Sequence, residues 1–312
     1  LYSNYSNIKN VSLRRILNPI FSKMRTFSHP GYKRFLLSVG CLLSIHFTAL
    51  FFLTLFRLVF FFSANYDFPD QEHVGFMSIW PAFIRGVWFD NVIACYILLI
   101  PLVAVSISAL FNYYGKILWN VTCIFFSLFY GIVLLVTAAN IPYFQYFFKI
   151  INSSVFNWFG YMNTTAGMVF GETSYYPPLI GFLLTLVLFI WLMRRLIRHF
   201  QRLLNTKNPS VFWLDRIYIF LTAGICIGLC LFGIRGRTGY NPIKVSAAYY
   251  CTDPFLNQLG ISPVFNLLSS TLDDSRKENR YLHLMPENEA LENTRHYLNR
   301  PGIEGISPIA RQ

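Results

Sequence analysis

Five long apolar segments, separated by polar ones, dominate the pattern of the chain. They cover residues 35–62, 90–111, 117–140, 177–193 and 212–234. An α-helix needs about 20 apolar residues to cross the hydrocarbon core of a bilayer, and each segment comes close to that length or exceeds it. The pattern therefore predicts an all-α, polytopic membrane protein with five transmembrane helices.

Charged residues are distributed unevenly between these segments, and their placement predicts the orientation. Residues 1–34 contain seven Lys or Arg and no acidic residue, and the segment 194–207 is also basic. The segment 64–82, by contrast, contains acidic residues and no Lys or Arg. Because Lys and Arg accumulate on the cytoplasmic side, we expect the N-terminus inside and, after five crossings, the C-terminus outside.

The same pattern divides the chain into three parts. They are a basic cytoplasmic segment (1–34), a transmembrane domain (35–234) and an extracytoplasmic part with juxtamembrane amphipathic helices (235–312). Residues 252–268 are expected to form one amphipathic helix, which either lies on the membrane surface or is a plain surface helix. Residues 285–300 read as a short polar helix, and residues 301–312 as a linker rich in Pro and Gly.

Composition narrows the classes of protein and partner. Hydrophobic residues make up 54% of the chain and charged residues 13%, which excludes an ordinary soluble domain. The net charge is +12, but the basic residues flank apolar segments, so anionic lipid is the expected partner and nucleic acid is not. The six cysteines show no metal-ligand spacing and are expected to be small packing residues.

Arg85 and Asp90 stand at the start of the second apolar segment, where charge is costly. Asp90 is expected either to cap the helix or, with Asn91, to form a polar site in the outer leaflet. Arg85 either snorkels to the head groups, pairs with Asp90 or binds a lipid phosphate. Arg57 is expected to snorkel, with pairing to Asp90 as the alternative.

A second group of cations follows the fifth segment. Arg235, Arg237 and Lys244 fall on the predicted outer side, against the positive-inside bias. An anionic head group or substrate explains their placement. We therefore predict a site for a lipid head group, formed by Arg85, Asp90, Asn91, Arg235 and Arg237.

No catalytic or metal-binding residue is predicted in the chain. It contains no G-x-S-x-G, H-E-x-x-H or Walker motif and no cluster of acidic residues. His46 lies inside the first segment and is expected to be packed or hydrogen-bonded. Asp215, at the start of the fifth segment, is expected to be structural.

Three stretches carry a resemblance to a known family. "GVWFDNVIACYILLIPL" in the second segment, "IRGR" at the end of the fifth and "AAYYCTDPFLNQLGISPVFNLLSS" after it resemble the N-terminal membrane part of lipoteichoic acid synthase-like proteins. These proteins belong to the alkaline phosphatase/sulfatase superfamily. The resemblance covers about residues 80–312, and Trp88 stands where an arginine is common in the family.

The resemblance implies a function. Family members carry an extracytoplasmic α/β domain with a threonine nucleophile and a divalent metal, Mn or Zn. That domain moves a phosphoglycerol or phosphoethanolamine group from phospholipid to an acceptor in the cell envelope. It would follow residue 312, so no cofactor is assigned to this chain itself. The implied partners are phospholipid, the membrane and the catalytic domain, and the implied location is the bacterial cytoplasmic (inner) membrane.

Two other functions stay open at this point. The chain is either a non-enzymatic polytopic protein, such as a transport component or a scaffold, or the anchor of a sulfatase-like hydrolase.

Overall fold

The computed structural model describes residues 29–64, 76–161, 167, 171–204, 213–276 and 285–298. Within these residues the regular structure is helical, without a β-strand. Five helices are long and apolar enough to cross a membrane: α2 (Pro30–Ser63), α3 (Phe76–Leu110), α4 (Lys116–Phe147), α6 (Tyr176–Leu204) and α7 (Trp213–Arg235). The five-helix prediction is therefore confirmed, whereas the side on which each terminus lies stays a prediction.

The chain divides into two compact units, Leu1–Ser269 and Ser270–Gln312. The second unit contains α11 (Glu287–Leu298), in agreement with the expected polar helix. Two features expected from the sequence, most of the basic N-terminal segment (1–28) and the linker (301–312), lie outside the described residues.

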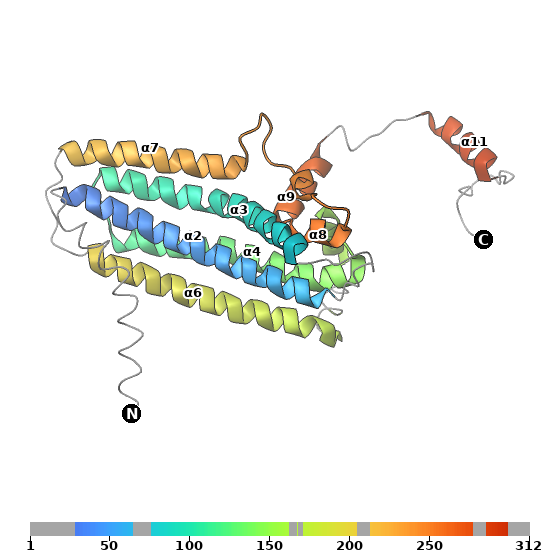
Figure 1. The fold of residues 1–312 in the computed structure, drawn as a ribbon, viewed down its shortest axis with the longest axis horizontal. Coiled ribbons are helices and arrows are strands. Elements are labelled where there is room, and N and C mark those ends of the chain that lie inside the picture. Colours follow the sequence, from blue (N-terminus) through green and yellow to red (C-terminus); the bar gives the residue numbers. More distant parts are fainter. Residues whose placement is uncertain are drawn as a thin grey trace, which may run out of the picture. The chain divides into compact units, whose positions relative to one another are not determined.

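α2 is the central helix of the first unit. It packs against α3, α4, α6 and α7, while α3 also packs against α7 and α4 against α6 (Figure 1). Only 11% of the most apolar stretch of α6 and 17% of that of α7 is buried, against 61% for α2 and α3. The outer faces of α6 and α7 therefore expose apolar side chains, as expected of helices that contact lipid.

An acidic residue of α7 fixes the beginning of α2. The Asp215 carboxylate lies 2.8 Å from His29 Nδ1 and accepts a hydrogen bond of 3.2 Å from the backbone N–H of Gly31. A helix N-terminus has unsatisfied N–H groups and favours negative charge. Asp215, which is fully buried, thus caps the helix, and its expected structural role is confirmed.

Several hydroxyl groups inside the helices are satisfied locally. The hydroxyls of Ser38, Ser106 and Thr137 each donate to the carbonyl oxygen four residues earlier. These hydrogen bonds allow the hydroxyl groups to lie in an apolar bundle. A polar group without a hydrogen-bond partner would there cost roughly several kcal/mol, as it does in hydrocarbon.

The ends of several spanning helices differ from the sequence prediction, and α6 also continues past the predicted end at residue 193 to Leu204. Hydropathy starts the second segment at residue 90, but α3 already begins at Phe76. Its first turns include Pro81 and Arg85, which lower the hydropathy without preventing a helix. Hydropathy likewise ends the third segment at residue 140, but α4 continues past Pro142 to Phe147. There Phe144 packs edge-to-face on Phe60 of α2, with ring centroids 5.0 Å apart.

Residues 236–266, which we call the cap, cover the end of the bundle where α7 ends. They include η3 (Val245–Ala248), α8 (Pro254–Leu259) and the first turn of α9 (Pro263–Ser275). The prediction of one amphipathic helix over 252–268 is wrong, because two helices meet at residues 260–262. The apolar side chains of α8 and of the first turn of α9 are buried in protein, as in the contact of Phe265 with Phe89, at 4.8 Å between ring centroids.

Candidate functional site

An ion pair between α2 and α3 lies beneath the cap. Arg57 Nη2 donates to Asp90 Oδ2 at 2.6 Å, and the two side chains are only 5% and 2% exposed. Asp90 lies well inside α3, so it does not cap that helix. The pairing alternative for Arg57 is the one observed, and the expectation that Arg57 snorkels is wrong.

Arg57 also ties the cap to the bundle. Its Nη1 group donates to the carbonyl oxygens of Leu259 and of Ile261, the latter at 3.1 Å. Gly86 of α3 is packed against the guanidinium, in a place where a Cβ atom would collide with it. Burial and three hydrogen bonds of this kind describe a structural clamp.

Arg85 points to the other side of the cap. It donates to the carbonyl oxygen of Ala247, and its guanidinium lies 5.0 Å from the centre of the Tyr250 ring. The Tyr250 hydroxyl in turn donates to the Ser78 carbonyl oxygen at 2.6 Å. Burial raises the pKa of Tyr250 above its ordinary value, so this hydroxyl stays protonated to a higher pH than that of a free tyrosine.

Arg235 and Arg237 hold the first loop of the cap. Arg235 Nη2 donates to the Tyr240 carbonyl oxygen at 2.7 Å and to that of Gly239, and Arg237 Nε donates to the Asn241 carbonyl oxygen at 2.6 Å. Arg235 is exposed. These carbonyl groups are neutral acceptors, and neither arginine forms an ion pair within the part of the chain that the structure describes.

Asn91 contributes to a groove rather than to the ion pair. Its Oδ1 atom lies 3.0 Å from His46 Nε2, which confirms the expected hydrogen-bonded histidine. The groove, with a volume of about 380 Å³, runs between α2, α3 and α7 and is lined mostly by apolar side chains. Trp88 and Gly236 line it too, and the Trp88 indole N–H donates to the Gly236 carbonyl oxygen. The groove thus reaches the end of α7, where Arg235 and Arg237 are.

The five residues predicted as a head-group site are distributed over the ion pair, the cap and the groove. In the part of the chain that the structure describes, no hydrogen bond or ion pair joins two of them. All five lie near the capped end of the bundle. Arg235 and Arg237 carry accessible charge, and Asn91 lines the groove, whereas Asp90 and Arg85 are engaged with protein groups.

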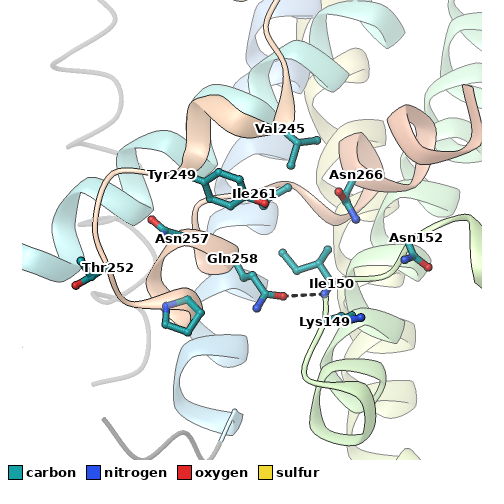
Figure 2. Close-up of a pocket in the computed structure, with 11 residues that line it drawn as sticks. Lys149, Ile150, Asn152, Val245, Tyr249, Thr252, Asn257, Gln258, Ile261 and Asn266 are labelled. Atoms are coloured by element: carbon teal, nitrogen blue, oxygen red, sulfur yellow. Dashed lines mark hydrogen bonds between the residues drawn. The ribbon is translucent and has the colours of Figure 1, made fainter. Parts of the chain in front are cut away.

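A second cavity, of about 430 Å³, lies between residues 149–152 and the cap (Figure 2). Amide side chains line it, and Lys149 supplies a cation. The amides also hold the backbone. Gln258 Oε1 accepts from the Ile150 N–H at 3.1 Å, and Asn266 Nδ2 donates to the Ile151 carbonyl oxygen at 2.9 Å. Such a lining suits a polar group that both donates and accepts hydrogen bonds.

Sequence reasoning did not identify either cavity. The groove is built from residues of three helices far apart in the chain, of which only Asn91 was singled out as a site residue. One side of the second cavity belongs to residues 141–176, a segment that stands out in the sequence for its amide side chains and for Lys149 as its lone cation. The other side, around Gln258 and Asn266, has no comparable feature in the sequence.

Comparisons with protein-family models, with curated proteins and with solved structures found no match.

Proposed function

We propose that this chain is a phospholipid-binding membrane module, the anchor and lipid-presenting part of a sulfatase-superfamily phosphotransferase in a bacterial cytoplasmic membrane. An acyl chain occupies the groove between α2, α3 and α7. The phosphate lies at the capped end, beside Arg235 and Arg237. The parent enzyme moves a phosphoglycerol or phosphoethanolamine group from this lipid to an acceptor in the cell envelope.

One observation carries the lipid-binding part of the proposal: an apolar groove ends beside accessible cations. The groove is lined by side chains such as Leu42, Leu98 and Leu229, which suit hydrocarbon. At its end Gly236 lies between Arg235 and Arg237 in the chain. A phospholipid has the same order of chemistry, with an apolar tail attached to an anionic phosphate.

The phosphotransferase part rests on the resemblance of residues 80–312 to lipoteichoic acid synthase-like proteins. It is tested by translating the reading frame that follows Gln312. A catalytic domain with a threonine and a carboxylate and histidine metal set supports the proposal. Its absence favours the alternative of a transport component or scaffold. A domain that hydrolyses sulfate esters but transfers no phosphoryl group favours the hydrolase alternative.

The lipid-binding part is tested by measuring the phospholipid that stays with the purified chain in detergent. The double variant Arg235→Gln, Arg237→Gln removes both cations near the groove. Near a lipid phosphate each is worth about 1 kcal/mol, so the affinity is expected to fall roughly 30-fold. The control is Arg194→Gln, Arg195→Gln, with the same loss of charge on α6. Equal retention by the two variants would contradict the proposal.

A further inference from the structure

The end of the bundle opposite the cap contains a third cavity, of about 490 Å³. It lies where α2 and α4 begin and α6 ends. Four cations line it, and none of its lining residues is acidic: Arg34, Lys116, Arg198 and Arg202. Lys116 and the two arginines of α6 are exposed, whereas Arg34 is only 7% exposed.

Arg34 is held in place at the back of this cavity. Its Nη2 group donates to the Leu204 carbonyl oxygen at 2.9 Å, and its guanidinium lies 5.7 Å from the centre of the Tyr114 ring. The carbonyl is a neutral acceptor. None of the described residues that line the cavity is a carboxylate.

Two buried polar atoms of the lining have no hydrogen-bond partner among the described residues. They are the Tyr114 hydroxyl oxygen and Asn112 Oδ1. A buried polar group without a partner is unfavourable, so these two atoms, which line the cavity, are suited to a ligand. A hydroxyl donates to a phosphate oxygen, and an amide oxygen accepts from an alcohol.

The beginning of α4 adds to the positive potential. The N-cap residue is Gly115, which offers no side chain, and the first turn contains no acidic residue. The N–H groups of a helix N-terminus favour an anion. In this cavity they stand beside the side chain of Lys116, the first residue of the helix.

We infer that this cavity binds a phosphate ester that also carries a free hydroxyl, at the end of the bundle predicted to face the cytoplasm. The phosphate lies among the four cations, and its alcohol reaches Asn112. A glycerol-type head group of an anionic phospholipid and a soluble phosphate ester share this chemistry. This site is separate from the groove beside Arg235, which lies at the other end of α7.

The test uses the full chain in nanodiscs or detergent and three probes. These are short-chain phosphatidylglycerol, phosphatidylcholine of the same chain length, and glycerol 3-phosphate. The affinity of each is measured from the shift of the thermal unfolding midpoint. We expect phosphatidylglycerol to bind more tightly than phosphatidylcholine, and Arg198→Gln, Arg202→Gln to weaken it roughly 30-fold. Both arginines are exposed, so this variant is expected to fold.

The matched control is Arg194→Gln, Arg195→Gln, which removes the same charge from α6 outside the cavity. Tightest binding of phosphatidylglycerol assigns the site to a lipid, whereas equal binding of glycerol 3-phosphate assigns it to a soluble phosphate ester. Equal effects of the two double variants, or binding of neither anionic probe, would overturn the inference. Tyr114→Phe is a second check, because it removes a donor without changing charge.

Discussion

At the scale of single residues, the Arg57–Asp90 pair explains why two charges are tolerated in an apolar bundle. Each charge compensates the other, and Arg57 finds further acceptors in the carbonyl groups of the cap. A buried ionisable side chain without a counter-charge would either become neutral or disrupt the packing around it. The pair therefore supports the joint between bundle and cap rather than contacting lipid.

Removing one member of the pair is expected to destabilise the protein. Asp90→Asn leaves the Arg57 charge buried and uncompensated, at a cost of about 3 kcal/mol in the free energy of unfolding. Denaturant unfolding of the purified chain in detergent measures this. Unchanged stability together with loss of bound phospholipid would instead place Asp90 in the lipid site.

Gly86 is expected to tolerate no side chain. A Cβ atom there meets the Arg57 guanidinium, so Gly86→Ala should displace it and cost about 1–3 kcal/mol of stability. Gly228→Ala is the matched control, because nothing lies within 4 Å of a Cβ atom at that position of α7. Similar unfolding midpoints for both variants would show that Arg57 does not fill this space.

The sequence shows that Asp90 is an unusual charge beside an apolar segment, but it does not show what Asp90 does. Because hydropathy starts the second segment at residue 90, Asp90 is expected at a helix end. In the structure it lies inside α3, facing an arginine 33 positions earlier in the chain. The pairing depends on how α2 packs against α3, which no local pattern determines.

At the scale of elements, the cap is organised by one amide. Asn257 Oδ1 accepts from the Tyr250 N–H at 2.9 Å and from the Cys251 N–H at 3.3 Å, and Asn257 Nδ2 donates to the Cys251 carbonyl oxygen at 2.7 Å. The side chain therefore fixes the loop that precedes α8, and with it the position of Tyr250 over Arg85.

Asn257→Ala is expected to loosen this loop without unfolding the bundle. It removes three hydrogen bonds to the backbone, each worth about 1 kcal/mol, and the contact with the Cys251 thiol. Hydrogen exchange should speed up at the Tyr250 and Cys251 amides and stay unchanged in α3. Exchange that rises equally in both places would mean that the cap and the bundle unfold as one.

Sequence patterns predicted the spanning helices well because a membrane demands a long apolar run. They failed where polar and apolar residues mix. The cap stretch at 252–268 has an amphipathic composition, but Gly260 and Pro263 divide it into two helices that both bury side chains. Burial by protein and burial by lipid give the same hydropathy, so the sequence could not tell them apart.

At the scale of the whole molecule, the uneven charge predicts the orientation of the bundle. A reporter that is active only in the cytoplasm should work when fused after Leu204, and a reporter that is active only outside should work when fused after Tyr240. The reason is the cluster of arginines at the end of α6. The reverse activities would invert the topology and move the groove's cations to the cytoplasm.

The groove also belongs to this scale, because it exists only once α2, α3 and α7 are assembled. Blocking it tests the proposed function most directly. Leu229 lines the groove from α7, so Leu229→Trp should fill it, and phospholipid that stays with the purified chain should fall several-fold. Leu221→Trp is the control, since Leu221 is exposed on the same helix and does not line the groove. Equal phospholipid in both variants would contradict a lipid-presenting groove.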